Sequence, residues 1–174
     1  MPVLFSHPVL SVEGFPVQTS AGEQTYVRLR MPDWCNVVAI TKDRRLVLVR
    51  QHRWGIEEST LEIPGGVVDP GEDPLEASKR ELREETGFAG GTWTALGAVT
   101  SNPAIQDNRT WMFLAEGVEL RGAPERGPGE EGMTVETPAL SSLPELLTSG
   151  DIDHALAVAS LQRYLLQSVR AQES

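Results

Sequence analysis

Three glutamates near the middle of the chain have the residue types and the spacing of a metal site. Glu84 and Glu85 follow Glu81 by three and four residues, so in a helix all three carboxylates share one face. Like charges at this spacing repel, and the end of a helix is where its dipole disfavours anions. A divalent cation removes both penalties, and clustered carboxylate oxygens are the ligands that Mg²⁺ or Mn²⁺ prefers.

A solvated acidic helix face is the commoner explanation of such a charge run, and the surrounding residues are needed to decide against it. Gly65 and Gly66 leave room for a polyanion, and the tight loop they form can bring a backbone carbonyl to the same cation. Arg80 is expected to pair with Glu76 at i,i+4, with Glu72 as a second partner within reach. Together these features favour the metal site.

A helix is predicted from Asp73 to Thr86, and it positions the three glutamates. Asp73 is a good N-cap, Pro74 suits the first helical position, and Glu76 at the third completes a capping-box pattern. Gly87 supplies the left-handed residue that ends the helix.

The rest of the chain predicts a mixed α/β protein in one domain over residues 1–174. Strands are expected within 9–30 and at 35–40, 45–49, 61–63, 93–100, 110–116 and 133–137. Further helices are expected at 143–147 and from 154 to about 167, the second with an apolar stripe facing the core. Residues 121–132 hold four glycines and two prolines, which predicts a long loop.

Composition limits the classes of partner. The chain has 174 residues with 15 basic and 25 acidic side chains, a net charge of −10 that argues against nucleic-acid binding. No segment is apolar for long enough to span a membrane, and the first residues lack the features of a signal peptide. The single cysteine, Cys35, is expected to be a small buried group. We therefore expect a cytoplasmic protein without a membrane partner.

The segment around the glutamates resembles the Nudix box at every defining position. The matching residues are Gly66, Glu72, Arg80, Glu81, Leu82, Glu84, Glu85, Gly87 and Phe88. The pattern fixes many residue types, so a chance match is far less probable than for a short glycine motif. The resemblance implies an α/β/α sandwich with a mixed sheet, preceded here by N-terminal antiparallel strands. It also implies hydrolysis of nucleoside diphosphates linked to another moiety.

The same resemblance implies roles for individual residues. Glu81, Glu84 and Glu85, with the Gly65 carbonyl, would hold one or more Mg²⁺ or Mn²⁺ ions, and an ion pair of Arg80 with Glu72 would brace the box. The ions would activate a water for in-line attack on phosphorus. No covalent intermediate is required.

Weaker motifs outside the box are similar to the branch that hydrolyses ADP-ribose and nucleotide sugars. The strand-end sequence from Arg50 to Arg53 looks like the RQYR of that branch, where Arg53 would contact the pyrophosphate. A surface arginine is the equally plausible alternative. Pro103, fifteen residues beyond Phe88, stands where the branch carries a proline. The surrounding SNPAIQDN differs from the loop of the stricter ADP-ribose enzymes, which favours a range of nucleotide sugars with ADP-ribose included.

The resemblance also suggests a general base and an assembly. Glu130 and Glu131 in the glycine-rich loop are the two candidates for the base, and the sequence does not choose between them or exclude a purely solvating role. His154 is expected to make a polar or packing contact at the start of the last helix. A homodimer is implied, in which N-terminal strands within about residues 1–33 are exchanged.

The aromatic residues are expected to serve mainly in structure. Trp34, Trp54, Trp93 and Trp111 are predicted to lie in the core or an interface, with Tyr26 or Trp34 as candidates to stack on a nucleobase.

Two other functions remain open from the sequence. One keeps the box but takes dinucleoside polyphosphates or damaged nucleotides as substrates, and Arg53 and Pro103 count against it. The other is a sensor that binds ADP-ribose-like compounds without turnover, and the intact box counts against that.

Overall fold

A mixed sheet forms the centre of the molecule in the computed structural model, which describes residues 2–172. Strand β4 (Trp34–Thr41) lies between β5 (Leu46–Arg53), which is antiparallel to it, and β10 (Arg109–Leu120), which is parallel. Leu46 to Val49 are fully buried, as their continuous apolar run predicts. Within the described residues this sheet has eight strands, with the order β11-β5-β4-β10-β8 along its main path.

The remaining strands pair with these three, and all of them except the nine-residue β9 are short. They are β6 (Glu58–Glu62) and β11 (Thr134–Glu136) on β5, β7 (Gly65–Val67) on β4, and β8 (Phe88–Ala89) and β9 (Thr92–Thr100) on β10. The sequence predicted only part of β6 and none of β7 or β8, because two or three residues carry too little periodicity. Residues 121–133 form the predicted long connection, without a helix or a strand.

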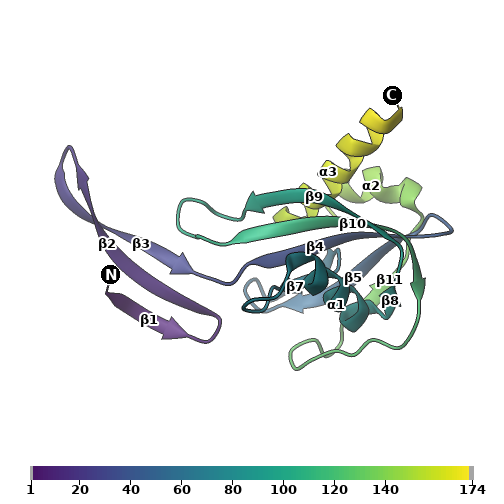
Figure 1. The fold of residues 1–174 in the computed structure, drawn as a ribbon, viewed down its shortest axis with the longest axis horizontal. Coiled ribbons are helices and arrows are strands. Elements are labelled where there is room, and N and C mark those ends of the chain that lie inside the picture. The colour runs from purple at the N-terminus through teal and green to yellow at the C-terminus, as the bar shows by residue number, and fades with distance from the viewer. Residues whose placement is uncertain (1, 173–174) are drawn as a thin grey trace.

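Helices cover both faces of the sheet (Figure 1). On one face Val38, Ile40 and Leu48 pack with Leu161 of α3 (Ala155–Gln172), and on the other Val37 and Val47 pack with Leu82 of α1 (Pro74–Thr86). The alternation of these residues along β4 and β5 separates the two cores. A 3₁₀ turn (Leu140–Ser142) and α2 (Leu143–Thr148) complete the layer of α3. The predicted α/β/α arrangement is present.

The Asp73 N-cap and the Gly87 C-cap of α1 agree with the sequence, whereas the Glu76 carboxylate, expected to complete a capping box, pairs with Lys79. The Asp73 carboxylate accepts hydrogen bonds from the backbone N–H groups of Leu75 and Glu76, and Gly87 ends the helix with φ of 75°. This fixes which carboxylates face the sheet.

A separate three-stranded antiparallel sheet stands apart from this body (Figure 1). Its strands are β1 (Val3–His7), β2 (Leu10–Thr19) and β3 (Gly22–Arg30). The sequence did not predict β1, every residue of which is exposed. Two contacts join the sheet to the loop before β10: Leu29 N–H donates to the Ile105 carbonyl oxygen at 2.7 Å, and Arg30 Nη1 lies 2.6 Å from Asp107 Oδ2.

The prediction for Cys35 is confirmed, and for Trp54 the core alternative is wrong, while the interface alternative stays a prediction. Cys35 is fully buried, and burial raises the pKa of its thiol to about 11, as expected of an inert packing group. Trp54 was expected in the core or an interface, yet 78% of it is exposed in the chain, with its ring edge-on to His52 at 4.6 Å. Trp54 follows the last residue of β5, so it projects beyond the sheet rather than into a core.

Candidate active site

Arg80 braces the loop that precedes α1 against the helix. Its Nε lies 3.0 Å from Glu72 Oε1, its Nη2 lies 2.9 Å from Glu72 Oε2, and Nη2 also donates to the Val67 carbonyl oxygen at 3.0 Å. The predicted Arg80–Glu72 pair is therefore present. The predicted Arg80–Glu76 pair is wrong, because Glu76 lies instead 2.7 Å from Lys79 Nζ. Both oxygens of Glu72 bind the Arg80 guanidinium, and this bidentate pair is stronger than a single i,i+4 contact with Glu76 would be.

The same guanidinium also contacts two of the three candidate metal ligands. Arg80 Nη1 lies 2.7 Å from Glu81 Oε1 and 3.2 Å from Glu84 Oε2. Glu85 is held separately, because its Oε2 accepts a hydrogen bond from the Gly65 backbone N–H at 2.9 Å. One cation thus offsets part of the repulsion between Glu81 and Glu84. Within residues 2–172 Glu85 forms no ion pair, and the more distant charge of Arg53 is the only charge that favours its ionised form.

Burial makes the charged forms of Glu81 and Glu85 costly. It raises the pKa of Glu85 to about 8, with the nearby carboxylates of Glu81 and Glu130 adding to the effect. The pKa of Glu81 is also raised, chiefly by burial and then by Glu84 and Glu130. Carboxylates in this state gain either from a proton or from a bound cation. Within residues 2–172 no three acidic, histidine or cysteine side chains already converge on one point. The donor set itself, all carboxylate oxygen, fits a hard divalent ion.

Two glycines leave the space in which these carboxylates lie. A Cβ atom on Gly66 would lie 2.3 Å from Cδ of Glu81, and one on Gly65 would lie 2.2 Å from the Cys35 carbonyl oxygen. The first clash displaces a site carboxylate and the second displaces backbone of the central strand. The residues required by the predicted box therefore have a steric reason in this fold.

Replacing Gly66 with alanine should cost far more activity than stability. The new methyl group pushes the flexible Glu81 carboxylate aside, so we expect kcat/KM to fall by about a hundredfold or more while unfolding changes by about 1 kcal/mol. Gly122→Ala is the matched control, because a Cβ there meets nothing within 4 Å. Equal activity of the two variants would contradict the claim that the Glu81 carboxylate needs the space beside Gly66.

A cavity of about 930 Å³ opens beside these carboxylates. Its lining includes Glu81, Glu85, Gly65 and Gly66, and the aromatic side chains of Trp34, His52 and Trp54. Of the two predicted base-stacking candidates, Trp34 lines the cavity, whereas Tyr26 lies in the N-terminal sheet outside the lining. The volume suits a ligand of small-molecule size.

The lining also includes a polar cluster around Glu62, a residue whose role the sequence did not indicate. Arg53 approaches Glu62 with two nitrogens, Nε at 2.6 Å from Oε1 and Nη2 at 2.7 Å from Oε2. Burial alone would raise the pKa of Glu62, but hydrogen bonds from Arg53, His154 and Thr60 hold it well below the usual range. The available signal was a lone carboxylate between the apolar residues Leu61 and Ile63.

The structure brings together only some of the predicted site residues. Arg53, Gly65, Gly66, Glu81, Glu85 and Glu130 all line the cavity. Glu84, Pro103 and Glu131 are not part of the lining, and the loop around Pro103 contributes Ser101, Gln106 and Asn108 instead.

Comparison with known proteins matches this geometry to a family. The model of the NUDIX domain matches residues 32–160, which include both faces of the sheet and every lining residue except Met31. The chain belongs to the Nudix family. The Nudix resemblance of the box is thereby confirmed, and divalent-metal dependence is a general property of Nudix hydrolases.

Two relatives and one solved structure support this membership. The chain is 26% identical to an ADP-ribose pyrophosphatase of Bacillus subtilis over 98% of its own length and 93% of that protein. It is 32% identical to a methanol dehydrogenase activator of Bacillus methanolicus over 68% of its length, spanning 64% of that protein. A solved structure of an ADP compounds hydrolase superposes with a TM-score of 0.84 at 26% identity, covering 98% of this Nudix chain and 92% of the other.

These matches confirm the mixed-sheet fold and the ADP-ribose pyrophosphatase branch of the Nudix family. Among the described helices, none is both long and apolar enough to cross a bilayer.

Proposed function

We propose that this chain hydrolyses the pyrophosphate bond of nucleoside diphosphate sugars, ADP-ribose included, to a nucleoside monophosphate and a sugar phosphate. The observation that carries the proposal is one cavity lined by the buried carboxylates of Glu81 and Glu85, by the side-chain-free backbone of Gly65 and Gly66, and by Arg53. Carboxylates for a cation, space for a polyanion and a guanidinium are what a pyrophosphate substrate requires.

Mg²⁺, or Mn²⁺ in its place, is the proposed cofactor, held by Glu81, Glu84 and Glu85 with the Gly65 carbonyl. When bound, it supplies charge neutralisation of the pyrophosphate and an acidified water. Arg53 binds the diphosphate with the part of its guanidinium that Glu62 does not occupy, and Trp34 offers a face to the nucleobase. Arg80 and Glu72 hold the loop and the helix in register, so they position the carboxylates without contacting substrate.

Glu130 is the general base that we propose. The loop carrying it is anchored to α1, because Arg126 donates from Nε and Nη2 to the Glu85 carbonyl oxygen at 3.1 Å each. Each of the two glutamates accepts a hydrogen bond from a backbone N–H of the loop at 2.7 Å, Glu130 from Gly127 and Glu131 from Gly129, but of the two only Glu130 lines the cavity. Because Glu130 and Glu131 are neighbours in the same loop, a substitution of either one is a control for the same substitution of the other.

Substitution of these two glutamates should separate them. We expect Glu130→Gln to lower kcat by about a hundredfold, the usual size of a lost general base, while Glu131→Gln stays within about twofold of the parent. Single-turnover rates at saturating Mg²⁺ measure this directly. The opposite order would assign the base to Glu131, and two unchanged rates would remove the loop from the chemistry.

A panel of substrates tests the proposed activity. Purified protein with Mg²⁺ is given ADP-ribose, UDP- and GDP-sugars, dinucleoside polyphosphates, 8-oxidised nucleotides and nucleoside triphosphates. We expect the sugar nucleotides to have the highest kcat/KM of all compounds in the panel. Turnover of triphosphates or dinucleoside polyphosphates alone would replace the substrate class, and tight binding of ADP-ribose without turnover would support a sensor.

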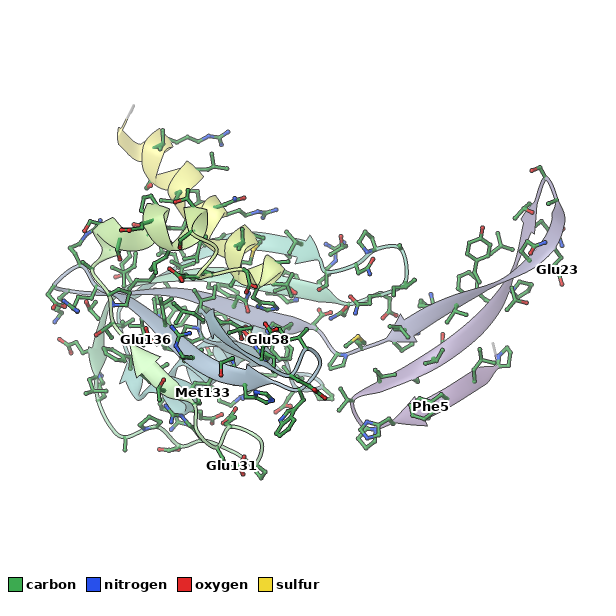
Figure 2. The ribbon with its side chains drawn as sticks, turned by 180° about the vertical axis from the view of Figure 1, so that it is seen from behind. Phe5, Glu23, Glu58, Glu131, Met133 and Glu136 are labelled. Atoms are coloured by element: carbon green, nitrogen blue, oxygen red, sulfur yellow. The ribbon has the colours of Figure 1, made fainter. Side chains whose placement is uncertain are left out.

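We also propose that the chain is a homodimer formed through its N-terminal sheet. That sheet stands apart from the body, with Phe5 on its strand β1 (Figure 2), and it exposes a set of large apolar side chains, Val3, Leu4, Phe5, Val9, Tyr26 and Val27. Apolar surface of this kind on a projecting element is typical of an interface. With a single buried thiol and ten excess negative charges, we further propose a cytoplasmic setting and a small-molecule substrate rather than nucleic acid.

Disrupting this surface should change the assembly. Leu4→Glu, which puts a charge on a residue 59% exposed in the isolated chain, is expected to shift the protein from dimer to monomer in light scattering at micromolar concentration. Leu166→Glu on α3, 67% exposed and remote from the sheet, is the control and should leave the mass unchanged. A parent protein of monomeric mass would contradict the proposal.

A further inference from the structure

The Glu62 carboxylate has all of its contacts with neighbouring side chains and none left for a ligand. It receives Arg53 on both oxygens, Thr60 Oγ1 at 2.5 Å on Oε1, and His154 Nδ1 at 2.8 Å on Oε2. Only 3% of its side chain is exposed, against 32% for Arg53 and 33% for His154. Glu62 therefore acts by orienting two partly exposed groups that line the cavity.

The contact with Glu62 determines what His154 presents to the cavity. An ionised carboxylate only accepts hydrogen bonds, so Nδ1 of His154 must carry the proton in this pair. In the neutral imidazole the other nitrogen, Nε2, is then an acceptor with a free lone pair. Such an arrangement fixes the tautomer as well as the plane of the ring.

An acceptor at this position selects among the parts of a nucleotide sugar. A fully ionised phosphate has no proton to donate, and the Arg53 guanidinium next to His154 already provides donors for it. A sugar hydroxyl is both donor and acceptor and can donate to Nε2. Asp153, a second acceptor, precedes His154 in the chain and also lines the cavity.

We propose that His154 is a specificity-determining residue, whose Nε2 accepts a hydrogen bond from a hydroxyl of the sugar beyond the pyrophosphate. Glu62 is the positioning residue that holds the imidazole for this contact. The inference rests on the proposed hydrolysis of nucleotide sugars and adds the group that recognises the sugar.

Two substitutions of His154 test the assignment, because one of them removes only Nε2 and the other removes both ring nitrogens. His154→Asn retains an N–H donor close to the place of Nδ1 and lacks any atom at the place of Nε2. His154→Leu lacks both. The substrates are ADP-ribose and ADP methylated on its β-phosphate, which keeps the adenosine and the pyrophosphate but has no terminal sugar.

For ADP-ribose, we expect KM of His154→Asn to rise about tenfold with kcat little changed, the size of one lost hydrogen bond. For the methyl ester, kcat/KM should stay within about twofold of the parent value. The melting temperature of His154→Asn should match the parent, whereas that of His154→Leu should fall because Glu62 loses a donor.

Two results would overturn the inference while leaving the proposed function intact. One is an equal loss on both substrates, which would assign His154 to the phosphate or the adenosine. The other is no loss on ADP-ribose with His154→Asn. A parent protein that hydrolyses neither compound would overturn the proposed function, and this assignment with it.

Discussion

Replacing Glu85 with glutamine lowers kcat with Mg²⁺ by about a thousandfold or more, a loss of roughly 4 kcal/mol of transition-state stabilisation. Glu85 is 3% exposed, lines the cavity and binds the Gly65 backbone N–H, and no positively charged side chain among residues 2–172 forms an ion pair with it. Of the three candidate metal ligands, Glu85 is therefore the one whose ionised form gains most from a bound cation. The amide of glutamine occupies the same volume without the charge.

The folded state should tolerate this change. The amide oxygen of glutamine can still accept the Gly65 N–H, and the replacement removes a buried carboxyl whose pKa is raised to about 8. The metal-free variant is therefore expected to melt at or above the temperature of the parent at pH 8, measured by circular dichroism. Glu76→Gln, on the exposed side of the same helix, is the control and should keep full activity. An unchanged kcat for Glu85→Gln would remove Glu85 from the metal site.

Replacing Arg53 with methionine lowers the free energy of unfolding by about 3 kcal/mol, because it leaves the buried Glu62 carboxylate without its bidentate partner. Combining it with Glu62→Gln should restore part of this loss, giving a coupling energy of about 2 kcal/mol in a double-mutant cycle. Urea unfolding of the four proteins measures both quantities.

Arg50 provides a matched control for Arg53 on the same strand. It pairs with Glu136 at 2.7 Å, but the two side chains are 43% and 40% exposed, so Arg50→Met should cost less than about 1 kcal/mol. A cost for Arg53→Met no larger than that for Arg50→Met would mean that Glu62 is not held as an ion. The stabilising role of the cluster would then be wrong.

Local patterns in the sequence were enough to predict the box and the helix that carries it. The capping residues Asp73 and Gly87 fix where α1 begins and ends, and the spacing of Glu81, Glu84 and Glu85 then fixes their common face. The strand β5 was equally clear, because Leu46 to Val49 form an unbroken apolar run typical of a strand buried on both faces.

The rest depends on contacts between distant segments. Glu62 meets His154 across 92 residues of chain, so neither residue could be assigned its partner from spacing. The Arg80 prediction failed for a related reason: the helix offered Glu76 at i,i+4, but the folded loop offered both oxygens of Glu72. The exposed strand β1 has no core-facing pattern, and its sheet stands apart from the body.

The most direct test of the central claim follows the phosphorus atoms of ADP-ribose during reaction with the parent protein and Mg²⁺. Phosphorus NMR is expected to show the diphosphate signals replaced by two phosphomonoesters in equal amounts, AMP and ribose 5-phosphate, with no reaction when the metal is chelated. An unchanged diphosphate, or ADP with free ribose as the products, would contradict the claim that this site hydrolyses the pyrophosphate bond.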